Sequence, residues 1–324
     1  MGKITTIALA SAALIAGWQP AMAQTNWNFA NAYAATEFQS QGYDMFAKKV
    51  SEGTNGAVNI TLHHGGSLFP NPEILQATRD GLVEVGTQLM TNLGRENALW
   101  DLDGLPFFVS SYDEAKKLWA LSRPRMEELL GQTGLKLLFA APWPTQGFFS
   151  KKEIKAVADF KGLKMRAYNP STTRMAELLG ATPLTVQMTE TPQAFATGLI
   201  DSINTSPTSG VVYTMWDYAP YYLKTDAWIP KQMVFVRKDK FDELSPENQK
   251  VVLDASAEAE AWLWDKSESL VAEAEKTFVD KGMTVTRPDE AFAGELKGIG
   301  NTMVQEWMAN ADDQAKAVVS EMQK

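Results

Sequence analysis

The sequence predicts an α/β protein with two lobes, and three observations support that prediction. Short apolar runs with strand character alternate along residues 27–90 with segments whose apolar residues recur at helical intervals. About 300 residues follow the N-terminal leader, which is above the size at which one hydrophobic core usually splits into two. From Pro246 to Asp280 no Gly or Pro interrupts the chain except the opening Pro246. A helix of this length reaches roughly 50 Å, longer than one lobe is wide, so we expect it to back both lobes.

The N-terminal residues are typical of a secretory signal. Lys3 precedes an apolar run that ends at Ala16, and Ala21-Met22-Ala23 fits a small-x-small cleavage site. We therefore expect residues 1–23 to be a signal peptide and the mature chain to begin near Gln24. A membrane anchor is the alternative, but the apolar run is shorter than the ~20 residues that a spanning helix needs.

Composition restricts the class of protein further. The chain has no cysteine, so it has neither a disulfide framework nor a thiol for a lipid anchor, and we expect a soluble mature protein. The formal net charge is −9. An acidic exported chain is a poor candidate for binding nucleic acid or anionic membrane surfaces.

The elements of the first half follow one another as strand, helix, strand, helix and strand. Gly53 and Gly81 stand where the first two helices should end. In a sheet of this kind, ligand sites lie at the carboxyl ends of the strands. We predict strands at residues 27–32, 58–62, 83–90 and 135–141, and helices at 38–50, 74–80 and 112–130.

The second half repeats the alternation. Ser245, Pro246 and Glu247 form a helix start with a side-chain cap, a proline in the first turn and an acid that suits the helix dipole. We predict strands at residues 163–166, 182–186, 199–204 and 233–236, helices at 172–179, 191–197 and 246–280, and a helical tail at 292–322.

Arg166 is the first candidate for a functional residue. It ends the predicted strand that follows Lys161-Gly162, so a rigid element would hold a planar guanidinium that matches a carboxylate with two parallel hydrogen bonds. Thr205 and Ser206 end a neighbouring strand, where their hydroxyl groups can share an anion with the guanidinium. The alternative interpretation of Arg166 is a surface arginine in a salt bridge.

Several aromatic residues are candidates for the walls of a binding site. Pro142 and Pro144 flank Trp143, and their fixed backbone would hold the indole in a defined orientation. Trp216 lies in a region crowded with tyrosines. For each of these rings, packing in a core is the alternative.

The usual enzyme motifs are missing from the sequence. His63 and His64 are the only histidines, and neighbours in a strand point to opposite faces, so they cannot chelate one metal ion together. HExxH, GxSxG, P-loop and GxGxxG patterns are also missing. We therefore expect no metal and no cofactor, and the usual hydrolase, metalloenzyme and nucleotide-binding classes are disfavoured. A hydrolase that uses a pair of carboxylates, such as a glycosidase, stays open as an alternative.

Four stretches give the chain a family likeness. The sequences LHHGGSLFPNPEILQATRDGLVEVG (62–86), KGLKMR (161–166) with a following Asn, GLIDSINTSP (198–207) and LSPENQKVV (244–252) resemble the DctP-type extracytoplasmic solute receptors of TRAP transporters. The likeness covers nearly the whole mature chain. Residues 142–170 and 228–231 resemble a branch associated with aromatic or otherwise apolar carboxylates.

This resemblance implies a fold and a function. The fold would be a two-lobe, type II-like periplasmic binding protein with an inter-lobe cleft, a strand shared by the lobes and the long shared helix. The protein would be a periplasmic receptor, not an enzyme, which closes over an organic acid and delivers it to a TRAP membrane permease. We expect a monomer, with lobe I formed by residues 24–143 and 232–271 and lobe II by residues 144–231 and 272–324.

The resemblance also assigns roles to single residues. The arginine that matches Arg166 pairs with the ligand carboxylate, and a polar residue at the position of Thr205 or Ser206 often assists. Many members carry a second arginine where this chain has Gln146, which favours a monocarboxylate. The ligand-binding set implied in this way is Arg166, Gln146, Trp143, Tyr168, Asn169, Thr205, Ser206, Trp216, Phe69 and Asn92.

Other ligands and other protein classes stay open at this point. The ligand can instead be a C4-dicarboxylate or a sugar acid. The chain can instead be a receptor for another importer class with the same two-lobe plan, the ligand module of a sensor, or a secreted carboxylate-dependent hydrolase.

Overall fold

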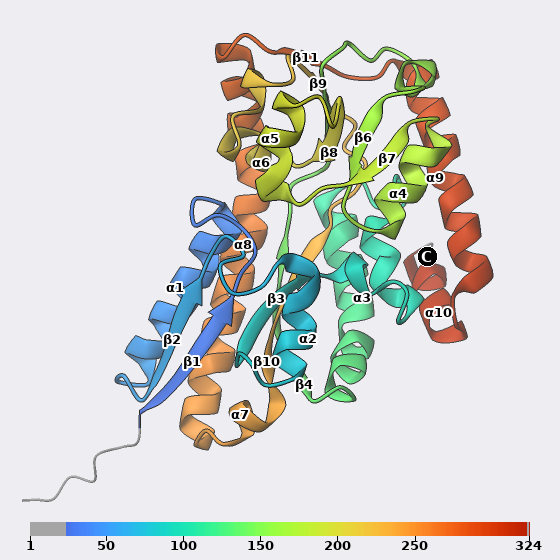
Figure 1. Cartoon of the computed structure of the whole chain (residues 1–324). Coiled ribbons are helices and arrows are strands. Elements are labelled where there is room, and N and C mark those ends of the chain that lie inside the picture. Colours follow the sequence, from blue (N-terminus) through green and yellow to red (C-terminus); the bar gives the residue numbers. More distant parts are fainter. Residues whose placement is uncertain (1–23, 323) are drawn as a thin grey trace, which may run out of the picture.

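The computed structural model describes residues 24–322 and 324, so the expected signal peptide lies outside the described residues. The described chain forms two lobes, each built on its own β-sheet (Figure 1). The mixed α/β architecture with two lobes confirms the fold class expected from the sequence. No helix in the described part of the chain is long and apolar enough to cross a membrane.

The first lobe contains a five-stranded sheet with the strand order β2-β1-β3-β10-β4. Strand β1 runs parallel to β2 and β3, whereas β10 runs antiparallel to both β3 and β4. Strand β10 follows β5 to β9 of the other sheet in the chain, so the chain returns to the first lobe through β10. The strands are β1 (Thr25–Ala30), β2 (Val58–His63), β3 (Val85–Leu89), β4 (Leu135–Pro142) and β10 (Lys231–Arg237).

The second lobe contains a six-stranded sheet with the strand order β11-β9-β5-β8-β6-β7. Strand β8 is the parallel neighbour of β6 and the antiparallel neighbour of β5, so the carboxyl ends of β6 and β8 meet at one edge of the sheet. The strands are β5 (Gly147–Ser150), β6 (Lys164–Ala167), β7 (Thr182–Thr185), β8 (Ser202–Thr205), β9 (Tyr221–Leu223) and β11 (Thr284–Thr286).

Helices cover both sheets. Six of the seven predicted helical segments each correspond to one helix of the structure, with ends that differ by at most a few residues. The helices are α1 (Phe38–Gly53), α2 (Ile74–Arg79), α3 (Tyr112–Gly131), α4 (Pro170–Leu178), α5 (Thr191–Ala196), α6 (Pro207–Val212), α7 (Lys238–Asp242), α8 (Pro246–Asp280), α9 (Glu290–Asn310) and α10 (Asp313–Met322).

Helix α8 runs along both lobes, as its length predicts (Figure 1). It packs against α1 and β4 in the first lobe and against α6 and β11 in the second. Its start has the expected cap, because the side chain of Ser245 accepts a hydrogen bond from the Asn248 amide. The strand expected to be shared corresponds to two consecutive strands, β4 and β5, which belong to different sheets and are joined by residues 143–146.

The C-terminal tail differs from the single helix expected at residues 292–322. It consists of α9 and α10, and the chain is extended at Ala311 between them. Helix α9 lies against α4, whereas α10 packs on α3 of the first lobe. The residues counted with the second lobe therefore also contact the first, and the lobe boundaries given above stay a prediction.

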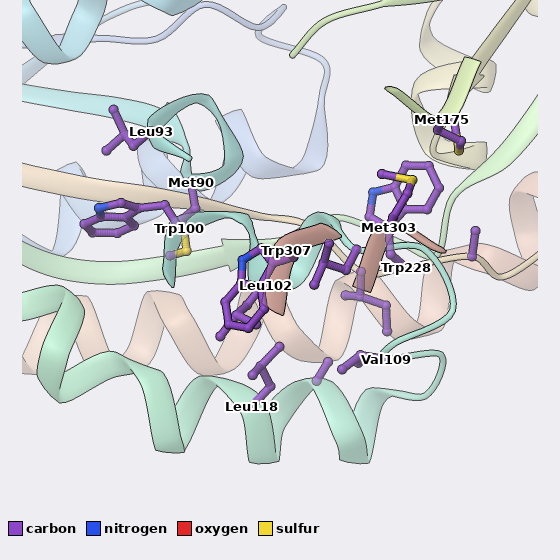
Figure 2. Close-up of a cluster of buried hydrophobic side chains, with 14 of the residues drawn as sticks. Met90, Leu93, Trp100, Leu102, Val109, Leu118, Met175, Trp228, Met303 and Trp307 are labelled. Atoms are coloured by element: carbon purple, nitrogen blue, oxygen red, sulfur yellow. The ribbon is translucent and has the colours of Figure 1, made fainter. Parts of the chain in front are cut away.

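A hydrophobic cluster connects these parts of the chain. It contains Leu102 and Leu118 from the first lobe, Met175 of α4, Trp228 between the lobes and Trp307 of α9. Figure 2 shows Trp307 beside Leu102 and Leu118. The indole nitrogen of Trp307 donates a hydrogen bond to the carbonyl oxygen of Ala98 at 2.7 Å, as expected for a buried tryptophan. Helix α9 is thus part of the core.

Candidate functional site

Two chain segments join the lobes side by side. The amide of Trp143 donates a hydrogen bond to the Pro230 carbonyl at 2.8 Å, and the amide of Gln146 donates to the Trp228 carbonyl at 3.1 Å. The Ala227 amide donates in return to the Gln146 carbonyl at 3.2 Å. These bonds tie residues 143–146 to residues 227–230 at the border between the two sheets.

A pocket of about 190 Å³ lies next to these segments, between the lobes. The first lobe contributes residues such as Asn71 and Leu89, and the second contributes residues such as Arg166 and Thr205. Leu89, Arg166 and Thr205 stand at or next to the carboxyl ends of β3, β6 and β8, where ligand sites of α/β sheets are found. Its volume is below the roughly 300–1,000 Å³ of pockets for drug-sized molecules, so the pocket suits a small molecule.

Arg166 is a buried cation in this pocket. It lies near the end of β6 and is 6 % exposed. Its Nε donates a hydrogen bond to the Val186 carbonyl at 2.8 Å, and its guanidinium lies 4.9 Å from the ring centroid of Tyr168. Among the described residues no carboxylate lies within 4.0 Å of it. Burial lowers the pKa of Arg166, but an arginine stays charged in a protein.

The terminal nitrogens of this guanidinium are therefore available to a ligand. Nε holds the side chain in place through Val186, and in the described chain neither Nη1 nor Nη2 has a hydrogen-bond partner. A buried charge without a counter-ion costs several kcal/mol, which an anion entering the pocket would remove. This rigid, unpaired fork is the main electrostatic feature of the site.

Five more of the ten sequence-predicted residues line the pocket with Arg166: Trp143, Gln146, Tyr168, Thr205 and Asn92. The ring of Trp143 lies 4.9 Å from that of Tyr33, which also lines the pocket. Gln146 donates its Nε2 hydrogen to the Pro144 carbonyl at 2.7 Å, which fixes its amide. Thr205 ends β8 beside β6, as its position after the strand predicts.

The structure does not bring the other four predicted residues into the pocket lining. Asn169 caps α4 and donates to the Thr91 hydroxyl at 2.6 Å, and Ser206 caps α6. Phe69 packs against the large hydrophobic cluster. Trp216 packs against the core of the second lobe, 5.3 Å from the ammonium group of Lys281. These side chains are used in capping and packing.

Sequence reasoning missed several lining residues, among them Tyr33, Asn71, Gln187, Met188 and Ser209. Asn71 stands in the connection that follows β2. Its Oδ1 accepts a hydrogen bond from Asn92 Nδ2 at 2.8 Å, while its own buried Nδ2 has no partner. A position at the carboxyl end of a predicted strand is the one signal that pointed to this loop.

Two contacts join the lobes through carboxyl groups, and one of them involves the lining residue Ser209. Ser209 of α6 donates its hydroxyl hydrogen to Glu37 Oε1 at 2.8 Å, and Ser171 of α4 donates to Asp101 Oδ1 at 3.1 Å. Burial raises the pKa of Glu37 to about 7 and that of Asp101 to about 6. Both carboxyl groups belong to the first lobe and both hydroxyl groups to the second.

Comparisons with known proteins agree with this geometry. A family model described as bacterial extracellular solute-binding protein, family 7 (DctP), matches residues 29–310. The crystal structure of DctP7, a Bordetella pertussis extracytoplasmic solute receptor binding pyroglutamic acid, is 37 % identical, with a TM-score of 0.91 over 93 % of this chain and 100 % of that chain.

Two further relatives extend the comparison. A marine metagenome TRAP solute-binding protein specific for pyroglutamate is 35 % identical, with a TM-score of 0.90 over 93 % of this chain and 99 % of that chain. A monocarboxylate 2-oxoacid-binding periplasmic protein of Nostoc sp. is 26 % identical over 262 residues, which are 79 % of this chain and 72 % of the relative.

Proposed function

The chain belongs to the bacterial extracellular solute-binding proteins of family 7, and from that premise we propose that it receives a small organic monocarboxylate for a TRAP transporter. The proteins of this family are solute receptors and not enzymes, and TRAP receptors work with a membrane permease. The ligand class and the roles of single residues are the substance of the proposal.

One observation supports the proposal most directly, namely the free guanidinium fork of Arg166 in the pocket. A carboxylate is the planar anion that such a fork binds with two parallel hydrogen bonds. Thr205 adds a hydroxyl group at the end of the neighbouring strand β8. Together these groups compensate one carboxylate for the water that it loses on binding.

The charges of the lining favour a single carboxylate. Arg166 is the one Lys or Arg among the described lining residues, and Glu190 is a lining residue of opposite sign. Gln146, where many relatives carry a second arginine, is neutral and bound to Pro144. A second carboxylate would therefore be buried without a cation, at a cost of several kcal/mol.

The remaining walls fit a small ligand with an apolar body and one further polar group. Trp143, Tyr168 and Met188 offer apolar surface, and an aromatic partner adds ~0.5–1.5 kcal/mol per well-placed ring pair. The unpartnered Nδ2 of Asn71 would donate a hydrogen bond to an acceptor oxygen. Pyroglutamate, which relatives at 35–37 % identity bind, combines these features.

A sugar acid is the second candidate, because amides and hydroxyls are numerous in the lining. Asn92, Gln187 and Thr189 would serve a ligand with several hydroxyl groups. The small pocket volume of about 190 Å³ favours the smaller monocarboxylates over it.

The proposed mechanism is hinge closure at the paired connecting segments. Arg166 belongs to the second lobe and Asn71 to the first, so one ligand that contacts both stabilises the state in which the lobes meet. We propose that the permease recognises this closed state. The export signal expected at residues 1–23 would place the receptor in the periplasm. We propose that it acts there as a monomer.

A ligand panel with a matched pair of variants tests the proposal. Thermal shift and calorimetry are run with pyroglutamate, 2-oxo acids, aromatic monocarboxylates, succinate and glucuronate. A ligand at a hundred times its Kd adds about 2.7 kcal/mol of apparent stability, or a Tm increase of a few degrees. We expect monocarboxylates to rank first, and dicarboxylates in first place would overturn the ligand class.

The variant Arg166→Lys should lose affinity for the best acid about 10- to 100-fold. The ammonium group lacks the fork, and a hydrogen bond to a charged group is worth about 1.5–3 kcal/mol. Arg174→Lys is the control, because Arg174 on α4 makes its ion pair with Glu306 at the surface. Equal affinities of the two variants would remove Arg166 from the site.

A further inference from the structure

Glu37 is a buried carboxyl group whose hydrogen-bond partner belongs to the other lobe. It directly precedes α1 in the first lobe and is fully buried. Its Oε1 accepts the hydroxyl hydrogen of Ser209, which lies on α6 of the second lobe and lines the pocket. Its Oε2 is buried without a hydrogen-bond partner. The carboxyl group thus lies where the two lobes meet, next to the ligand position.

The surroundings of Glu37 offer it no cation. The negative charge of Glu37 helps to raise the pKa of three tyrosines, namely Tyr33 from the β1–α1 connection, Tyr43 of α1 and Tyr213 after α6. Arg166 acts on Tyr33 and Tyr213 but is not among the groups that set the pKa of Glu37. In the described chain no Lys, Arg or His lies within 4.0 Å of the Glu37 carboxyl oxygens. A carboxylate buried in this way is costly, and a proton on it removes the cost.

The environment of Glu37 depends on how the lobes are arranged. With the lobes in contact, Ser209 and the pocket wall exclude water, and burial raises the pKa of Glu37 to about 7. When the lobes separate, the bond to Ser209 is lost and water reaches the carboxyl group, whose pKa then returns towards about 4.3. Closure therefore changes the number of protons bound.

We infer that Glu37 is a positioning residue, acting through Ser209, that couples ligand binding to the uptake of a proton. The inference rests on the proposed function, because the ligand is what brings the lobes together. The sign follows from linkage. The closed state binds more protons than the open state between about pH 4.3 and pH 7, so rising pH through this window opposes closure. Affinity is highest in acid and levels off above the window.

The first test is calorimetry of the unaltered mature protein. Pyroglutamate, or the acid of the panel that binds tightest, is titrated at pH 6 in buffers with different ionisation enthalpies. We expect uptake of close to one proton per bound acid, and a Kd that rises on the order of tens-fold between pH 5 and pH 8. The α-carboxyl group of the probe, with a pKa of about 3.3–3.7, stays ionised throughout and adds nothing. Binding without proton uptake and with a flat pH profile would overturn the inference.

The second test compares two variants across the same pH range. Glu37→Gln keeps an oxygen to accept from Ser209 but cannot titrate, so its Kd should rise several-fold less than that of the wild type from pH 5 to pH 8. Asp101, whose pKa burial also raises, accounts for the rise that is left. Asp101→Asn is the matched control, since Asp101 bridges the lobes through Ser171 but is less buried. Asp101→Asn should keep most of the change of Kd with pH that the wild type shows. The assignment would be contradicted if the Kd of Glu37→Gln depended on pH as strongly as that of the wild type. It would also be contradicted if only Asp101→Asn lost this dependence.

Failure of the proposed function has a different signature. If no acid of the panel binds at any pH, the receptor assignment fails and the inference fails with it. If an acid binds and Arg166→Lys weakens it, but the binding is independent of pH, only the role of Glu37 is overturned.

Discussion

Arg166 and Glu190 are the charged side chains among the described residues that line the pocket, and the other lining residues are neutral. The selectivity of the site at the residue scale therefore depends on how many cations it presents. Gln146 is the position at which this number can be changed, because it lies in the pocket wall and is 4 % exposed.

The variant Gln146→Arg should shift the preference of the receptor towards dicarboxylates. A second guanidinium would pair a second carboxylate, and a charge-assisted hydrogen bond contributes about 1.5–3 kcal/mol. We expect the ratio of the succinate Kd to the pyroglutamate Kd to fall at least tenfold. Calorimetry with both acids measures it, and Gln146→Met, which changes the same side chain without adding a charge, is the control. An unchanged ratio would show that residue 146 does not set selectivity.

Some site residues could be predicted from the sequence and others could not, because only some of them carry a local signal. Arg166 was predicted because a strand end and a family motif both point to it, and it lies in the pocket lining. Trp216 and Phe69 were offered as walls because aromatic residues line pockets and cores alike, and only packing separates the two uses. Glu37 and Ser209 are 172 residues apart in the chain, and nothing local to either residue predicts their contact.

At the scale of elements, two glycines in helices have opposite surroundings. Gly210 of α6 faces the rings of Phe149 and Phe278, and a Cβ atom there would overlap Phe149 and lie 2.8 Å from Phe278 Cζ. Gly294 of α9 has no atom within 4 Å of the place where a Cβ would lie. Helix α6 therefore needs its glycine for close packing, whereas α9 does not.

Alanine at these two positions should change stability in opposite directions. Gly210→Ala should lower the free energy of unfolding by about 1–3 kcal/mol, the usual cost of overpacking. Gly294→Ala should raise it by up to about 1 kcal/mol, because alanine is the better helix former. Urea unfolding of both variants beside the wild type measures the difference. A stabilising Gly210→Ala would contradict the packing described for α6.

Long elements were predicted well and short ones poorly. Helix α8 has a capped start and no interruption over 35 residues, so its bounds were predicted correctly. Strands β9 and β11 have three residues each, too few to show an alternating pattern. The break between α9 and α10 falls at Ala311-Asp312, where neither Gly nor Pro marks it. Packing of α10 on α3 decides that break.

At the scale of the molecule, three side-chain hydrogen bonds join the lobes. Thr91 bonds to Asn169, Asp101 to Ser171 and Glu37 to Ser209. Hydrogen bonds of this kind contribute only about 0.5–1.5 kcal/mol each. The hydrophobic cluster around Trp228 and Trp307 joins the lobes away from the pocket, so we expect the two sides of the pocket to separate by tilting about that cluster.

Closure should be visible with two fluorescent labels. The chain contains no cysteine, so Gln41→Cys on α1 and Gln193→Cys on α5 provide two exposed attachment sites, one on each lobe. Adding a saturating acid should raise the energy transfer between the labels, because the lobes approach each other. The same pair in Arg166→Lys should respond only at much higher concentration. Equal transfer with and without acid would exclude hinge closure.

Helix α8 limits how that movement can take place. It is anchored on α1 and β4 at one end and on α6 and β11 at the other (Figure 1). A continuous helix resists stretching far more than it resists bending or rolling of the parts attached to it. The lobes keep a constant spacing along this rod and can only tilt about it. If the permease recognises the closed state, as proposed, it would sense the angle between the two lobes and would therefore contact both of them.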